Sequence, residues 1–206
     1  MLNKFTPIQE TTNIPSILDR VFWEDSFATQ SLSKAITNHL NMLNHNRQDI
    51  VLVCVGTDRS TGDALGPVVG TELLKSTIPN LQIYGTLDEP VHAANLDEYL
   101  AKISEAHANN VIIAVDACLG RAENVGYITA KTGPLRPGTG VNKDLPNVGD
   151  MHIIGTVNVG GFMEYLVLQN TRLSLIMNMA HVISTALSGG LREHLVYTLA
   201  SASQET

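Results

Sequence analysis

Apolar residues along the chain fall into short, mostly apolar runs and into stretches with helical spacing. The short runs predict buried strands at 50–55, 81–86, 111–116 and 152–157. Between them, apolar positions three or four residues apart predict helices over 65–76 and 95–108. This alternation of strand and helix is typical of a parallel sheet with right-handed crossovers.

More helices are expected on either side of this alternation. Apolar residues recur at helical spacing over 31–43. The C-terminal part of the chain predicts three helices, over 162–168, 172–187 and 190–201. Residues 1–29 have no clear periodicity, so we expect them to form an extension that packs on the domain or is partly mobile.

The stretch from 121 to 150 interrupts the pattern with turn-forming glycines and prolines. A short strand is expected within it at 126–129. A loop of this length in a compact domain is usually functional or mobile. We expect its segment 132–141 to line a cleft.

The chain length suits one well-buried domain, because 206 residues are few for two. No internal repeat or linker is visible. We therefore predict an N-terminal extension and helix over 1–47 and a single domain over 48–206. Its expected class is α/β, with three αβα layers around a mostly parallel sheet.

Composition excludes several classes of protein. Hydrophobic residues make up 44% and charged residues 16%, which is typical of a globular chain. No apolar run reaches the roughly 18 residues of a membrane span, and the N-terminus does not resemble a secretory signal, so we expect a cytoplasmic protein. The net charge of −7 argues against nucleic-acid binding. Without an export signal, Cys54 and Cys118 are expected to be reduced core residues.

Two aspartates follow predicted strands. Asp63 lies in the polar loop from Gly56 to Pro67, and Asp116 ends the run 111–116. In a unit with strand order 2-1-3 these two strands are neighbours, and ligands bind at the carboxyl edge of such sheets. Two close carboxylates do not both ionise easily, so one keeps a proton while the other can act as a base. Such a pair can activate water against an amide, and its oxygens also suit a divalent metal.

Each aspartate also has a purely structural interpretation. Asp63 precedes a predicted helix, where an N-cap stabilises by about 1 kcal/mol. Asp116 can simply end its strand. Asp58 and Arg59 either form an exposed ion pair or orient a substrate. His92, at the same predicted edge, is either a solvated loop residue or a ligand.

The loop after the predicted strand at 126–129 supplies the remaining candidates. Thr132, Gly133 and Gly138 belong to a Gly- and Pro-rich segment that could cradle a substrate backbone or cover the cleft. No P-loop, dinucleotide fingerprint, nucleophile elbow or zinc-type Cys/His spacing is present, so we expect no nucleotide chemistry.

These motifs resemble those of known protease families. The run from Gly56 to Pro67, the tripeptide Val115-Asp116-Ala117 and the segment 132–141 resemble the spore germination protease. A fuller resemblance, over about 48–190, is to the small sporulation proteins of the YyaC family. It includes the motif from Gly160 to Tyr165. The hydrogenase maturation endopeptidases are similar in the spacing of Gly56, Asp63 and Gly66.

The resemblance implies a phosphorylase/hydrolase-like domain with helices on both faces of the sheet. It implies that Asp63 and Asp116 are the catalytic pair of an aspartic-type peptidase. In the maturation enzymes the matching acids bind nickel together with a histidine. No histidine follows shortly after Asp116 here, so His92 or His152 would have to replace it. We therefore assign no cofactor, with a divalent metal as the alternative.

The leading hypothesis is a sporulation-associated peptidase-like hydrolase that cleaves a protein or peptide in the cytoplasm of the sporulating cell or spore. One alternative is a catalytically inactive binding protein of sporulation that keeps an enzyme-like pocket. Another is a metal-dependent hydrolase. No membrane partner is expected, and the apolar C-terminal helices leave a homodimer open.

Overall fold

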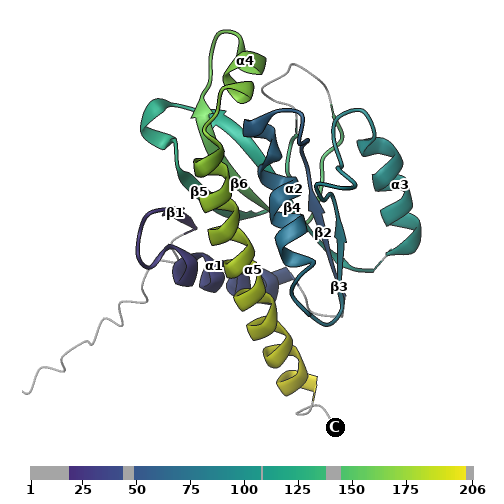
Figure 1. Ribbon diagram of the computed structural model, residues 1–206. Helices are drawn as coiled ribbons and strands as arrows, with labels where there is room; N and C mark the ends of the chain where they lie inside the picture. Colours follow the sequence, from purple (N-terminus) through teal and green to yellow (C-terminus); the bar gives the residue numbers. More distant parts are fainter. Residues whose placement is uncertain (1–18, 44–48, 108, 138–144, 203–206) are drawn as a thin grey trace, which may run out of the picture.

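A six-stranded mixed sheet forms the centre of the computed structural model, which describes residues 19–43, 49–107, 109–137 and 145–202 (Figure 1). The strands lie in the order β1-β5-β6-β4-β2-β3. Their bounds are Arg20–Phe22 (β1), Ile50–Cys54 (β2), Leu81–Tyr84 (β3), Val111–Gly120 (β4), Tyr127–Thr132 (β5) and Met151–Val159 (β6). Strands β3, β2, β4 and β6 run parallel, while β5 is antiparallel to β6 and β1. The mostly parallel sheet and the predicted order 2-1-3 are thus confirmed.

Helices cover both faces of the sheet. The α-helices are Ala28–Leu43 (α1), Leu65–Leu73 (α2), Leu96–Ala106 (α3), Glu164–Gln169 (α4) and Leu173–Ala202 (α5). Two short 3-10 helices, Thr61–Ala64 (η1) and Ala122–Asn124 (η2), complete the described elements. Within them, no helix is both long and apolar enough to cross a membrane.

Alternating side chains of β2 define the two cores. Ile50, Leu52 and Cys54 pack in one cluster with α1, α2 and α5. Val51 and Val53, together with Val55 directly after the strand, pack in a second cluster with α3 and with the segment before β6. Because β2 is buried on both faces, its sequence is continuously apolar. The predicted three-layer αβα class is confirmed.

Strand β4 does not end at Asp116, as the sequence suggested, but continues to Gly120. The pairing with β2 stops at Cys54 and Val115, whereas the pairing with β6 continues from Asp116 to Gly120. Asp116 is therefore the first residue of β4 beyond the end of β2. Asp63 and Asp116 are still expected to lie close together, because β2 ends beside Val115 and the loop that carries Asp63 begins there.

Residues Leu173–Ala202 form one helix of 30 residues rather than the two helices predicted over 172–187 and 190–201. Gly189 and Gly190 do not break α5, since they lie where it crosses α1. A Cβ atom at Gly190 would lie 2.9 Å from the Ser33 carbonyl oxygen, so the glycine permits close helix packing. The apolar face of α5 is used in the core, and a homodimer stays a prediction.

The region before residue 31 also contains more structure than expected. Residues 20–22 form β1 at the edge of the sheet, and α1 begins at Ala28. Strand β5 is longer than the predicted 126–129 and ends at Thr132. Strands β1 and β5 form by pairing between segments that are distant in the sequence, and local periodicity does not predict such pairing.

Candidate active site

Asp63 is held over the carboxyl end of the sheet by a tight turn between β2 and α2. Gly56 has φ +140°, and the Thr57 N–H donates to the Asp63 carbonyl oxygen at 3.1 Å. Neither η1 nor α2 has a side-chain cap hydrogen bond among the described residues. The N-cap interpretation of Asp63 is therefore wrong, and its carboxylate is left available to the space above the sheet.

Asp116 lies on β4 and is only 8% exposed. Its Oδ1 accepts a hydrogen bond from the Ala117 N–H at 2.8 Å. Side chains alternate along a strand, so Asp116 shares the sheet face of Ala114, in the core beneath α3. The Asp116 carboxyl group therefore accepts one backbone hydrogen bond and also lines a cavity.

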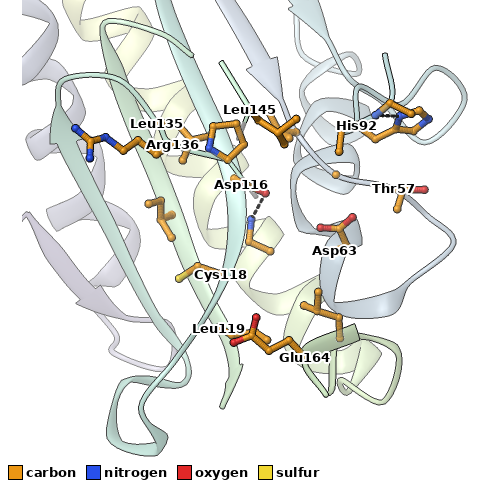
Figure 2. Close-up of a pocket in the computed structure, with 18 of the residues that line it drawn as sticks. Thr57, Asp63, His92, Asp116, Cys118, Leu119, Leu135, Arg136, Leu145 and Glu164 are labelled. Atoms are coloured by element: carbon orange, nitrogen blue, oxygen red, sulfur yellow. Dashed lines mark hydrogen bonds between the residues drawn. The ribbon is translucent and has the colours of Figure 1, made fainter. Parts of the chain in front are cut away.

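Both aspartates line one cavity of about 500 Å³. Figure 2 shows their carboxyl groups on opposite sides of this space. Much of the wall is apolar, with Val55, Leu119, Leu135, Pro137, Leu145, Ile154 and Leu168. Polar groups come from different elements and are Thr57, Arg59, His92, Cys118, Arg136 and Glu164. The cavity thus brings two carboxyl groups together with a largely apolar wall.

The two carboxyl groups have unlike surroundings. Burial raises the pKa of Asp116 well above its ordinary value, and the nearby Asp63 charge raises it further, against the opposing Ala117 N–H. Burial also raises the pKa of Asp63, but the His92 charge and the Thr57 N–H counteract that rise. The arrangement favours a proton on Asp116 and a negative charge on Asp63.

His92 reaches the cavity because the segment after β3 is attached to the end of β2. Val91 forms an isolated parallel β-bridge with Val55, and the Gly56 N–H donates to the Val91 carbonyl oxygen at 2.8 Å. The His92 Nδ1 accepts the Ala94 N–H at 3.3 Å, which in the neutral ring leaves the proton on Nε2. This histidine is therefore fixed on the same rim as Asp63.

The predicted substrate-binding residues separate into two groups. Arg59 lines the cavity, whereas Asp58 is exposed and is not part of the described wall. Within the residues described, no ion pair joins Asp58 to Arg59. The structural alternative proposed for these two residues is thus not seen.

The loop after β5 contributes different residues from those expected. Thr132 and Gly133 do not belong to the described wall, and the Gly133 carbonyl instead accepts the His152 Nδ1–H at 2.8 Å. Gly138 lies outside the described residues. Leu135, Arg136 and Pro137 form the loop's part of the wall. Leu135 is held there by two backbone hydrogen bonds with Val148.

Sequence reasoning gave no site role to Cys118 or Glu164. Cys118 follows Asp116 by two positions on one strand, and this spacing is the signal that could have placed it on the same face. Burial raises the pKa of the Cys118 thiol, which remains a neutral group. Glu164 belongs to the Gly160–Tyr165 motif but was not considered as part of the site.

The nickel arrangement of the maturation endopeptidases does not fit this site. Among the residues that the structure describes, no three or more His, Cys, Asp or Glu side chains are grouped so that they could hold a metal ion. His152 is bonded to Gly133 away from the cavity wall, and His92 does not complete a set with the aspartates.

Comparison with known proteins gives the family. The model of a family described as "Protein of unknown function (DUF1256)" matches residues 20–186. The chain belongs to the DUF1256 family. It is 58% identical over 139 residues to the Uncharacterized protein YyaC of Bacillus subtilis (strain 168), which is 68% of either chain. The resemblance to YyaC that the sequence motifs indicated is confirmed.

A solved structure shares the fold of this DUF1256 protein. The NiFe hydrogenase maturation protease HycI from Thermococcus kodakarensis KOD1 superimposes with a TM-score of 0.54 at 17% identity. The match covers 76% of this chain and 98% of that one. The predicted α/β fold is thereby confirmed.

We predict that Asp116→Asn stabilises the folded protein at neutral and alkaline pH. A carboxyl whose pKa is raised by folding loses stability as the pH climbs from its unfolded-state pKa toward its folded-state pKa. Asparagine keeps an acceptor for the Ala117 N–H without a charge to bury. Each unit of raised pKa corresponds to about 1.4 kcal/mol, so the gain should grow as the pH rises above the ordinary range of aspartate and be measurable at pH 8.

Urea unfolding at pH 3 and pH 8 measures this effect, with the exposed Asp88→Asn as the matched control. The Asp116 variant should exceed the parent at pH 8 and approach it at pH 3, where the carboxyl is protonated in both states. Equal free energies of unfolding of parent and variant at pH 8 would show that folding does not raise the pKa of Asp116.

Proposed function

We propose that this protein is a hydrolase that cleaves an amide bond of a protein or peptide substrate. Asp63 is the general base and Asp116 is the general acid. The observation that carries the proposal is the placement of two carboxyl groups in unlike environments around one cavity of about 500 Å³. The fold of a maturation protease supports this reaction class, although at 17% identity it transfers no residue roles.

The proposed reaction begins with a water between the two carboxyl groups. The Asp63 carboxylate takes a proton from this water as its oxygen attacks the substrate carbonyl carbon. Asp116 donates its proton to the carbonyl oxygen, so charge does not accumulate on it. The C–N bond then breaks as the amide nitrogen takes the proton from Asp63, and Asp116 recovers its proton from the collapsing hydroxyl.

The cavity wall provides the conditions for this chemistry. Aliphatic side chains such as Leu135 and Ile154 exclude water, which strengthens the electrostatic difference between the two carboxyl groups. The exposed guanidinium groups of Arg59 and Arg136 are suited to donate hydrogen bonds to carbonyl or carboxylate oxygens of the substrate. A polypeptide bound across the cavity meets both kinds of group.

The cellular setting belongs to the same proposal. The motifs shared with the germination protease and the YyaC family support a sporulation-associated role in the cytoplasm of the sporulating cell or spore. A protein substrate is favoured because the fold is similar to that of a maturation protease. The residues described do not form a metal site, so the mechanism uses none.

We predict that Asp63→Asn and Asp116→Asn each lower cleavage at least about 100-fold while the fold is retained, because each removes one proton transfer. The substrate is a tryptic peptide library from a bacterial proteome, with new termini counted by mass spectrometry. Thermal unfolding reports the fold, and Asp88→Asn is the matched control at an exposed position.

Cleavage by both variants at the parental rate would contradict the paired-acid mechanism. Inactivation of the parent by a chelator would instead support a metal-dependent hydrolase. Stable capture of library peptides with no cleavage between pH 4 and 9 would favour the non-catalytic alternative.

We further predict that His92→Gln moves the acidic limb of the kcat/KM profile to higher pH. The positive charge of His92 lowers the pKa of Asp63, so its removal raises that pKa and leaves less of the base ionised in acid. His92→Lys should move the limb back, and His181→Gln, on an exposed position of α5, is the control. An unchanged acidic limb in His92→Gln would show that the charge of His92 does not affect the catalytic base.

A further inference from the structure

The turn before α4 and the helix itself present a group of large apolar side chains to solvent. Phe162 is 91% exposed, Met163 56%, Tyr165 63% and Leu166 43%. We call these four residues the α4 platform. They lie within five consecutive positions, whereas apolar side chains exposed singly are ordinary on protein surfaces. Contiguous exposed apolar groups mark interaction sites.

The α4 platform has no part in either described core cluster. Helix α4 is attached through other residues, since Leu168 packs against the core and the Asn158 Nδ2 donates to the Val167 carbonyl oxygen at 3.3 Å. Burial of one such side chain is favourable. Four of them left in water therefore represent a binding free energy that the isolated fold does not use.

The backbone in front of α4 is shaped to hold the α4 platform outward. Gly161 has φ +144°, and a Cβ there would have no atom within 4 Å, so the turn projects from the surface. Met163 adopts φ +58°, a conformation that is strained for a non-glycine residue. The Glu164 Oε1 accepts the Gly161 N–H at 3.2 Å and closes the turn. Strain of this kind clusters at ligand clamps.

The other face of α4 is part of the cavity wall. Glu164 and Leu168, one helical turn apart, both line the cavity. Leu168 also covers the residue before Asp63, because a Cβ at Gly62 would lie 2.8 Å from the Leu168 Cδ2. Figure 2 places Glu164 on the border of the cavity near Leu119. A chain that leaves the cavity on this side must cross α4.

We infer that the α4 platform binds an apolar stretch of the same polypeptide whose amide bond enters the cavity. This inference rests on the proposed function and names the substrate class, a segment with large apolar side chains a few residues from the scissile bond. The α4 platform and part of the cavity wall are carried by the same short helix, which favours this occupant. Glu164 is the one charged residue from 159 to 171, so the surface lacks the cations that an anionic membrane attracts.

Peptide capture tests the inference without requiring turnover. Protein carrying Asp63→Asn is immobilised and incubated with the tryptic library, and bound peptides are sequenced by mass spectrometry. We expect enrichment of peptides with two or more large apolar residues. Adding Phe162→Ser and Met163→Ser should reduce that enrichment at least tenfold, with the thermal unfolding temperature retained.

The matched control removes two exposed apolar side chains elsewhere. Leu74 is 61% and Val196 68% exposed, and Leu74→Ser with Val196→Ser should leave the enrichment unchanged. Equal enrichment in the platform and control variants would overturn the inference. So would a dimeric parent, by light scattering, that becomes monomeric in the platform variant, because the α4 platform would then bind a second copy of the chain.

The two proposals fail in different ways. Apolar capture that depends on the α4 platform, with no cleavage by the parent, would contradict the hydrolase proposal and retain the binding site. Cleavage by the parent with the same sequence preference in the platform variant would contradict the binding site and retain the hydrolase.

Discussion

The close packing of α2 against the end of β2 is the constraint on which the site depends. A Cβ at Gly66 would lie 2.2 Å from the Val55 carbonyl oxygen, and one at Gly56 would lie 2.0 Å from the Asp63 carbonyl oxygen. Only glycine permits these approaches, so the chain turns back over the sheet edge at once. That turn brings the Asp63 carboxylate to the same cavity as Asp116.

Unequal burial then gives the two acids different chemistry. Asp116 is enclosed by the sheet and α3 layer, while Asp63 is on a rim shared with His92. Helix α4 links this centre to the surface, because one of its faces lines the cavity and the other carries the α4 platform. Catalysis and substrate selection would thus depend on elements packed against the same short turn, η1.

The sequence was sufficient for the strand order and for the juxtaposition of Asp63 and Asp116, because alternating strands and helices leave few possible topologies. The sequence did not predict features that depend on contacts between segments far apart along the chain. The continuation of β4 needs β6, the uninterrupted α5 needs α1 beneath Gly190, and the wall at Leu135 needs Val148. Local turn signals at 132–141 identified the right loop, but neither Thr132 nor Gly133 belongs to the described wall.

Carbon NMR titration of protein labelled at the aspartate Cγ tests the central claim most directly. The account predicts that Asp116 titrates well above the ordinary range of aspartate, because it is buried and faces the Asp63 charge. In Asp63→Asn that charge is lost, so the Asp116 titration should move to lower pH while remaining raised by burial. An Asp116 titration in the ordinary range, or one that Asp63→Asn leaves unchanged, would show that the two carboxyl groups do not form a pair.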